Sequence, residues 1–183
     1  MKNQLWPLAL LTCAALQGAR AQMAAPVAAP SATAAAAKQN AGNLLKPSLQ
    51  GTDAEGKAFK LAALRGKVVL VLFWSTDCPV CRDKMPELRE NYAGWRNKPF
   101  ELVTVSVDKR MQDVSDYEKI VSAMVPLKQR FVQLWAGAPG YSDNFDKPSA
   151  LPHAYLLDKT GQVVEQYNGR IPAAAWDRIA DLL

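Results

Sequence analysis

Cysteine and histidine are scarce in this chain, whose 183 residues include three cysteines and one histidine. So few cysteines exclude a small domain that depends on several disulfides for its stability. Apolar residues make up 49% of the chain and charged residues 21%, which excludes a collagen or a coiled coil and is typical of a globular domain. The length suffices for one domain with a sizeable core.

Long apolar runs are also missing, because none reaches the length of about 20 residues that a membrane-spanning helix needs. The N-terminus instead has a short basic start, Met1–Gln4, and then an apolar run over Leu5–Leu16. Ala19 and Ala21 match the small residues that precede a cleavage site. We therefore predict a signal peptide over residues 1–21 and export to the periplasm, with an uncleaved membrane anchor as the alternative.

Clusters of basic residues are absent as well. Cleavage would remove Lys2 and Arg20 and would lower the formal net charge from +5 to +3. A mild and scattered positive charge gives no indication of a nucleic-acid partner. Residues 22–43 are rich in alanine and have few large apolar side chains, so we predict a flexible linker there and a folded domain over residues 44–183.

The apolar periodicity of residues 44–183 predicts an α/β domain with a central mixed sheet. The expected elements are, in order, a hairpin of Ser48–Gln50 with Ala58–Leu61, a helical turn at Leu61–Leu64, a strand at Lys67–Trp74, a helix at Pro79–Trp95, a strand at Glu101–Val107, a helix at Asp113–Met124, a strand at Arg130–Leu134, a helical turn at Ser142–Asp146, a hairpin of Ala154–Leu157 with Gln162–Tyr167, and a helix at Pro172–Leu183. The alternation of strands and helices predicts helices on both faces of the sheet.

The motif Cys78-Pro79-Val80-Cys81 lies between a predicted strand and a predicted helix. This context places Cys78 at a helix N-terminus, where unpaired N–H groups stabilise a thiolate, and Pro79 suits the first helical turn. Cys81 follows one turn later on the same face of the helix. We therefore predict thiol–disulfide exchange, with Cys78 as the nucleophile and Cys81 as the thiol that resolves the mixed disulfide.

Structural roles fit the two cysteines less well. A disulfide between Cys78 and Cys81 would close almost no loop and would stabilise the fold little. A structural zinc site usually has four ligands, and after removal of Cys13 the chain offers only these two cysteines and His153. We predict no metal site, and no cofactor other than the redox-active disulfide itself.

Several segments around this motif also occur in a known family: Gly66–Trp74, Cys78–Arg82, Met85-Pro86 and Leu157–Val164. In these segments the chain resembles the periplasmic thioredoxin-like thiol–disulfide oxidoreductases of the TlpA/ResA family. The resemblance covers residues 45–183. It implies a thioredoxin fold with an N-terminal β-hairpin and a helix–strand insertion over Asp108–Leu134, and it implies disulfide exchange on exported proteins.

The resemblance also implies partners and a substrate-binding element. The expected partners are exported proteins that contain disulfides, such as apocytochrome c or a copper-site protein, together with a membrane thiol donor that keeps the dithiol reduced. Leu151-Pro152 stands where thioredoxin folds carry a cis-proline. A cis bond there would place the backbone of Leu151 against Cys78, where it can pair with a substrate strand.

The chain departs from the family pattern at positions that tune the thiols. Asp77 replaces an apolar residue before the first cysteine, and Lys84 replaces a glutamate three residues after the second. Asp77 should raise the pKa of Cys78 and Lys84 should lower it, so the sequence leaves the reduction potential open. Leu151-Pro152-His153 also differs from the small or polar pair that usually surrounds the proline, and Pro79 and Val80 between the cysteines are further tuning positions.

Other functions remain compatible with the same residues. A disulfide oxidase or isomerase would use the same cysteines in the opposite direction. A thiol peroxidase is a second alternative, because Ser75 lies three residues before Cys78, although Val71 stands where a peroxidase would have proline. A copper(I) chaperone could use both cysteines and His153. For His153 itself we favour a partly exposed position at a strand edge over a proton shuttle or a substrate contact near Cys78.

Overall fold

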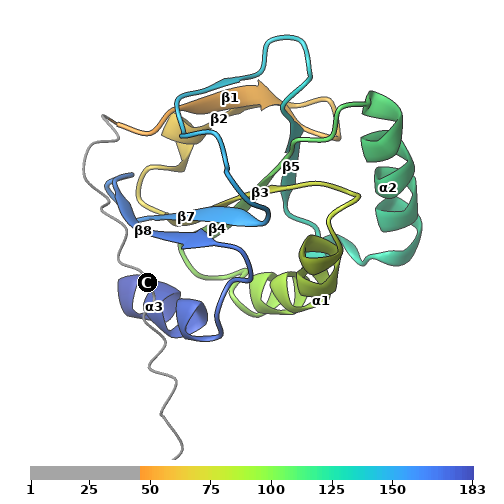
Figure 1. Ribbon diagram of the computed structural model, residues 1–183. Helices are drawn as coiled ribbons and strands as arrows, with labels where there is room; N and C mark the ends of the chain where they lie inside the picture. The colour runs from red at the N-terminus through yellow and green to blue at the C-terminus, as the bar shows by residue number, and fades with distance from the viewer. Residues whose placement is uncertain (1–45) are drawn as a thin grey trace, which may run out of the picture. The chain divides into compact units, whose positions relative to one another are not determined.

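A five-stranded mixed sheet forms the centre of the protein in the computed structural model, which describes residues 46–183 (Figure 1). The strand order is β5-β4-β3-β7-β8. The strands are β3 (Val68–Trp74), β4 (Phe100–Ser106), β5 (Val132–Trp135), β7 (His153–Leu157) and β8 (Val163–Asn168). Strands β3, β4 and β5 are parallel, whereas β7 and β8 are antiparallel to their neighbours. The expected signal peptide and linker lie outside the described residues.

Strand β3 occupies the middle of this sheet and is buried along its whole length. Its sequence has no polar residue, which suits a strand that other elements cover on both faces. Val71 pairs with Val103 of β4 on one side and with Tyr155 of β7 on the other. Alternate side chains of β3 therefore enter two separate apolar layers, one on each face of the sheet.

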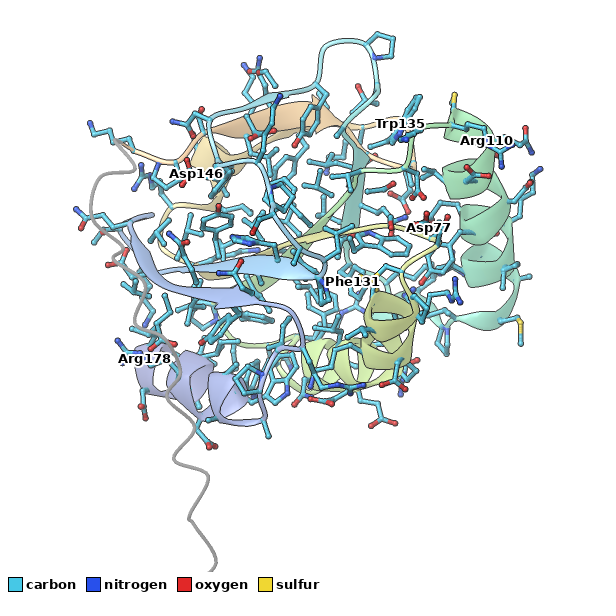
Figure 2. The ribbon with its side chains drawn as sticks, in the orientation of Figure 1. Asp77, Arg110, Phe131, Trp135, Asp146 and Arg178 are labelled. Atoms are coloured by element: carbon cyan, nitrogen blue, oxygen red, sulfur yellow. A yellow bond between two sulfur atoms is a disulfide. The ribbon has the colours of Figure 1, made fainter. Side chains whose placement is uncertain are left out.

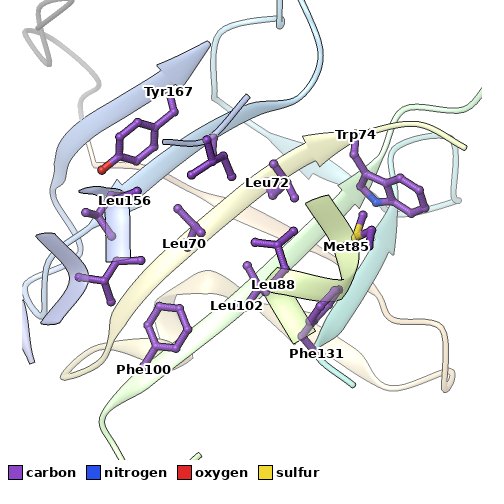
Figure 3. Packing of buried hydrophobic residues seen from close by; sticks show 14 of the residues in the cluster. Leu70, Leu72, Trp74, Met85, Leu88, Phe100, Leu102, Phe131, Leu156 and Tyr167 are labelled. Atoms are coloured by element: carbon purple, nitrogen blue, oxygen red, sulfur yellow. The ribbon is translucent and has the colours of Figure 1, made fainter. Parts of the chain in front are cut away.

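The first layer lies beneath α1 (Pro79–Gly94) and α3 (Ala174–Leu182), which cover the same face of the sheet (Figures 1 and 3). Its members include Leu70, Leu72, Trp74, Met85, Leu88, Leu102, Phe131, Leu156 and Ile179. Pro86 lies inside α1 without ending the helix. The helix continues because a proline removes only one intrahelical hydrogen bond, and the packing of Met85 and Leu88 holds both sides of it.

The opposite face is covered differently from the expectation of helices on both sides. A small sheet with the order β2-β1-β6 packs there, formed by β1 (Leu49–Thr52), β2 (Ala58–Lys60) and β6 (Ser142–Asp143), together with the 3₁₀ turn Leu61–Leu64. Helix α2 (Met111–Met124) lies beside the β5 edge instead (Figure 1). Only Val114 and Val121 of this helix are buried, and Tyr117 contacts Trp74 at the border of the first layer, so the helix covers neither face of the sheet.

The helical turn predicted at Ser142–Asp146 is also wrong, because Ser142–Asp143 form strand β6 and the next three residues are not helical. Ser142 pairs with Gln50 of β1, and the side chain of Asn144 accepts a hydrogen bond of 2.7 Å from the backbone N–H of Ser48. Strand β1 has an edge whose backbone groups need partners, and an extended segment satisfies them where a helical turn would not.

The remaining predicted helices, strands and hairpins are present, with ends that differ by a few residues. The predicted insertion appears as α2 followed by a 3₁₀ turn, Leu127–Gln129, and β5. Within residues 46–183, no helix combines the length and the apolar character that crossing a bilayer requires.

Replacement of a residue in the first layer tests this packing. Leu88 is fully buried between α1 and the sheet, so Leu88→Ala should lower the free energy of unfolding by about 2–5 kcal/mol through lost burial and a residual cavity. Leu127→Ala is the matched control, because Leu127 is 75% exposed and its truncation should change stability by no more than about 0.5 kcal/mol. Urea unfolding measures both, and equal losses in the two variants would contradict the layer as described.

Candidate active site

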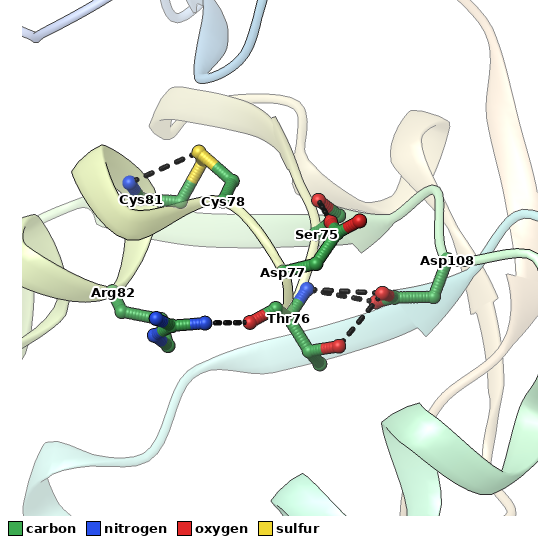
Figure 4. Close-up of a disulfide and its surroundings, with 7 residues drawn as sticks. All are labelled: Ser75, Thr76, Asp77, Cys78, Cys81, Arg82 and Asp108. Atoms are coloured by element: carbon green, nitrogen blue, oxygen red, sulfur yellow. Dashed lines mark hydrogen bonds between the residues drawn. A yellow bond between two sulfur atoms is a disulfide. The ribbon is translucent and has the colours of Figure 1, made fainter.

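The two cysteines lie where β3 leads into α1, and they form a disulfide (Figure 4). Cys78 is the N-cap of α1 and Cys81 lies in its first turn, with a Cα–Cα distance of 5.2 Å. The backbone N–H of Cys81 donates a hydrogen bond of 3.1 Å to the sulfur of Cys78. The sulfur therefore takes the place of a capping oxygen, and the same N–H and helix dipole would stabilise a Cys78 thiolate.

The cysteines differ sharply in exposure. Cys81 is only 1% exposed and packs in the layer beneath α1, whereas Cys78 is half-buried at the border of that layer. Pro79 and Val80 between them are exposed, and Val80 presents an apolar side chain to solvent. A large partner can therefore approach Cys78, while Cys81 is accessible mainly from within the pair.

The loop before Cys78 is fixed by hydrogen bonds on both sides of Thr76 (Figure 4). The backbone N–H of Thr76 donates to both carboxylate oxygens of Asp108, at 3.0 and 3.1 Å, and its hydroxyl donates to the same carboxylate at 2.8 Å. The guanidinium of Arg82 donates to the carbonyl of Thr76. The N–H of Cys78 closes the loop by donating to the carbonyl of Ser75 at 3.3 Å.

Sequence reasoning gave no role to Thr76 or Asp108. A usable signal was present, because Asp108 follows directly after the predicted strand Glu101–Val107, and the carboxyl ends of neighbouring parallel strands meet at one edge of a sheet. Polar residues at such ends come together in space although they lie far apart in the chain.

The Leu151–Pro152 bond is cis, as the sequence context predicted. Leu151 lies at the wall of a cleft of about 620 Å³, whose other walls are the loop Ser75–Asp77 and the segment Val107–Arg110. Figure 2 shows Asp77 and Arg110 on the same side of the molecule, beside the start of α2. The cleft therefore adjoins the residues that immediately precede Cys78.

Asp77 and Lys84 lie in different surroundings. Asp77 is exposed beside Cys78, and its carboxylate accepts a hydrogen bond from the hydroxyl of Ser75. Lys84 is buried, 5% exposed, and its ammonium donates to Glu87 at 2.6 Å. Glu87 also accepts a hydrogen bond of 2.5 Å from the indole of Trp176 in α3. The charge of Lys84 is therefore paired with Glu87 at the α1–α3 interface.

The carboxyl of Glu87 has a pKa below its usual value. Burial opposes ionisation, but the hydrogen bonds from Lys84 and Trp176 and the positive charge of Lys84 outweigh it. Glu87 consequently stays ionised and neutralises the buried ammonium. The pair introduces no net charge into the helix turn that follows Cys81.

His153 is buried, 6% exposed, in the inner strand β7, so the prediction of a partly exposed edge position is wrong. Its ring contacts Tyr155 at 4.7 Å between centroids and lies on the same sheet face as Phe73 and Leu157. Cys78 packs against the opposite face. Among residues 46–183, no group of three or more His, Cys, Asp or Glu side chains is arranged to hold a metal.

The mixed sheet, the helices on it and the dithiol at the start of α1 define a protein of the thioredoxin class. The AhpC/TSA family model matches residues 44–178. The thiol–disulfide oxidoreductase ResA of Bacillus thuringiensis (strain Al Hakam) is 32% identical over 123 residues, which cover 67% of each chain. ResA of a Bacillus cereus strain is 29% identical over 127 residues, again 67% of each chain.

Solved structures show the same architecture. A thiol:disulfide interchange protein of the thioredoxin family from Chlorobium tepidum TLS superposes with a TM-score of 0.58 at 25% identity, over 74% of this chain and 92% of that one. StoA from Bacillus subtilis superposes with a TM-score of 0.54 at 18% identity, over 72% and 96% of the two chains, and supports the fold alone. The chain belongs to the AhpC/TSA family and, within it, to the TlpA/ResA type of thiol–disulfide oxidoreductase.

The buried histidine gives a testable dependence of stability on pH. Burial lowers the pKa of His153 and outweighs Asn168 and Asp146, which act in the opposite direction. In the unfolded chain this histidine therefore takes up a proton near its ordinary pKa of about 6.5, whereas in the folded chain it stays neutral at that pH. Protonation of His153 in the unfolded chain favours unfolding. The free energy of unfolding should therefore be highest above about pH 6.5 and should fall as the pH decreases below about 6.5.

Urea unfolding at a series of pH values between about 7.5 and 5.5 measures this effect. His153→Phe does not titrate and should show a smaller decrease than the unchanged protein. Glu118, whose pKa is raised chiefly by burial, acts in the opposite direction in both proteins, so the difference between them isolates His153. Equal slopes in the two proteins would contradict the assignment.

Proposed function

We propose that this protein reduces disulfides in exported proteins, with Cys78 as the nucleophile and Cys81 as the resolving thiol. The observation that supports this most strongly is the unequal exposure of the two sulfurs at the N-terminus of α1. The accessible thiolate of Cys78, stabilised by the helix N-terminus, attacks the partner's disulfide. The buried thiol of Cys81, one turn away, then attacks the resulting mixed disulfide.

The exchange balances in two steps. The thiolate of Cys78 attacks one sulfur of the partner's disulfide, a new S–S bond forms, and the other partner sulfur leaves as a thiolate that takes up a proton. Cys81 loses its proton and attacks the sulfur of Cys78, which releases the second partner thiolate and forms the Cys78–Cys81 disulfide. Two electrons pass from the dithiol to the partner, so a thiol donor must reduce the pair again.

The partner's peptide is proposed to lie across the cleft beside Cys78. Leu151 forms one wall of this cleft, and the cis bond joins it to the buried Pro152. The backbone of Leu151 can pair with an extended segment of the partner. The exposed side chain of Val80 adds apolar contact next to the attacking sulfur. Asp77 and Lys84 are proposed to tune the thiols, the former directly beside Cys78 and the latter through the Lys84–Glu87 pair.

Export and partners complete the proposal. A signal peptide over residues 1–21 and a linker over residues 22–43 would deliver the domain of residues 44–183 to the periplasm. There a membrane thiol donor would supply electrons, and apocytochrome c or a copper-site protein would receive them. The relatives named ResA support an exchange function, and the mild net charge gives no reason to include nucleic acid.

Serine variants test the two roles. Cys81→Ser leaves the attacking sulfur but removes the resolving one, so it should accumulate mixed disulfides with the partner. Cys78→Ser should lose disulfide reduction almost completely and trap none. Insulin reduction and non-reducing electrophoresis of trapped species provide the measurements, with the double variant as the control. Trapping by Cys78→Ser and not by Cys81→Ser would reverse the assignment.

The reduction potential of the pair distinguishes the direction of electron flow. A value near the roughly −270 mV of thioredoxin supports a reductant, and a value near about −120 mV supports an oxidase. Asp77→Asn removes a negative charge beside Cys78, so it should lower the pKa of that thiol and make the pair more oxidising. Asp181→Asn, an exposed change in α3, is the control and should leave the potential unchanged.

Equilibration with glutathione redox buffers measures the potential, and the pH dependence of alkylation measures the thiol pKa. Rapid consumption of hydrogen peroxide by the same preparations would point to a thiol peroxidase. Tight copper(I) binding by the reduced protein would point to a chaperone. Either result, with no insulin reduction, would overturn the proposal.

A further inference from the structure

Asp108 is the centre of a hydrogen-bond network that reaches the ends of three strands. It lies just after β4 and is half-buried. Its carboxylate accepts three hydrogen bonds from Thr76, in the loop after β3, and one of 2.6 Å from the hydroxyl of Ser106 at the end of β4. Its backbone carbonyl accepts a hydrogen bond of 2.8 Å from the indole of Trp135 at the end of β5.

This network acts on the loop that carries Cys78. The β3–β4 pairing ends at Trp74 and Ser106, and one further hydrogen bond of 2.8 Å joins the N–H of Val107 to the carbonyl of Trp74. After Trp74 no ladder hydrogen bond fixes the chain. The loop is fixed instead by the hydrogen bonds from Thr76 to the Asp108 carboxylate. A charged acceptor makes stronger bonds than a neutral one, so this single side chain anchors the loop firmly.

We propose that Asp108 is a positioning residue for Cys78, which fixes Thr76 and thereby holds the sulfur of Cys78 at the start of α1, within reach of Cys81. This inference rests on the proposed exchange function and adds a residue to it. Asp108 touches neither sulfur. It acts by keeping the effective concentration of the two thiols high, which determines how readily their disulfide forms.

Because of its position, Asp108 should affect the loop before Cys78 and not the overall stability of the fold. The pairing of β3 with β4 ends at Ser106, two residues before Asp108. The side chain of Asp108 lies at the wall of the cleft and belongs to neither apolar layer. Loss of the carboxylate should therefore loosen the loop Ser75–Cys78 and leave the two apolar layers intact. The cleft wall formed by Ser75–Asp77 would lose its fixed shape at the same time.

Asp108→Asn tests the proposal, because asparagine keeps the size but loses the charge and one of the two acceptor oxygens. Asp158→Asn is the matched control: Asp158 also accepts bonds from a threonine N–H and hydroxyl, but in the distant β7–β8 turn. We expect the equilibrium constant for oxidation of the dithiol by oxidised glutathione to fall about tenfold in Asp108→Asn and less than about twofold in Asp158→Asn.

Variants of Thr76 separate positioning from charge. Thr76→Val removes one hydrogen bond to Asp108 without a change in charge and should lower the equilibrium constant for oxidation by about threefold. Thr76→Ser keeps the hydroxyl, and its constant should equal that of the wild-type protein. If the constant falls only in Asp108→Asn, and the alkylation pKa of Cys78 falls with it, Asp108 acts through its charge and the positioning role is wrong.

Two further outcomes decide the matter. Equal constants in Asp108→Asn and Asp158→Asn overturn the inference. If Asp108→Asn does not fold, the comparison of Thr76→Val with Thr76→Ser decides alone, and equal constants in those two variants overturn it. The glutathione equilibrium needs no protein partner. A wild-type protein that fails to reduce insulin therefore overturns the proposed function without deciding the role of Asp108.

Discussion

The burial of β3 on both faces is the constraint on which the site depends. Because this strand has no polar residue and lies between β4 and β7, its C-terminal end is held in a fixed place at the edge of the sheet. The chain must leave the sheet there and enter α1, in which Cys81 and Met85 pack into the first apolar layer. Cys78 is thereby brought to a helix N-terminus, and Cys81 is buried one turn later, which produces the unequal exposure that the proposed chemistry uses.

Parallel pairing adds the second part of the site. The ends of β3, β4 and β5 lie side by side, so Thr76, Asp108 and Trp135 meet although they are far apart in the chain. Strand β5 ends the insertion at Trp135, whose indole donates to the carbonyl of Asp108, and the carboxylate of Asp108 bonds Thr76 in the loop before Cys78. Hydrogen bonds of Asp108 thus link the insertion to the loop that carries Cys78.

The buried charge near the dithiol is balanced by a neighbouring carboxylate. The buried ammonium of Lys84 is neutralised by Glu87, whose ionised form is favoured by the same contact and by Trp176. The departure from the family's usual glutamate at this position is thus accompanied by a carboxylate three residues later in the same helix. Asp77 remains the exposed charge directly beside Cys78, which makes it the more direct means of changing the thiol pKa.

The sequence by itself determined the central strand, the dithiol at the start of a helix and both hairpins, because these follow from local patterns of apolar residues, glycines and prolines. The insertion followed instead from the resemblance to the TlpA/ResA family. Only the tertiary structure decided which residues those elements bring together. The alternation of side chains in β7 put His153 on the face away from Cys78, and the open edge of β1 turned Ser142–Asp143 into a strand. Thr76 and Asp108 belong to the site only because β3 and β4 end at the same edge. The sequence marks where each strand ends, but it does not show that the two strands are neighbours.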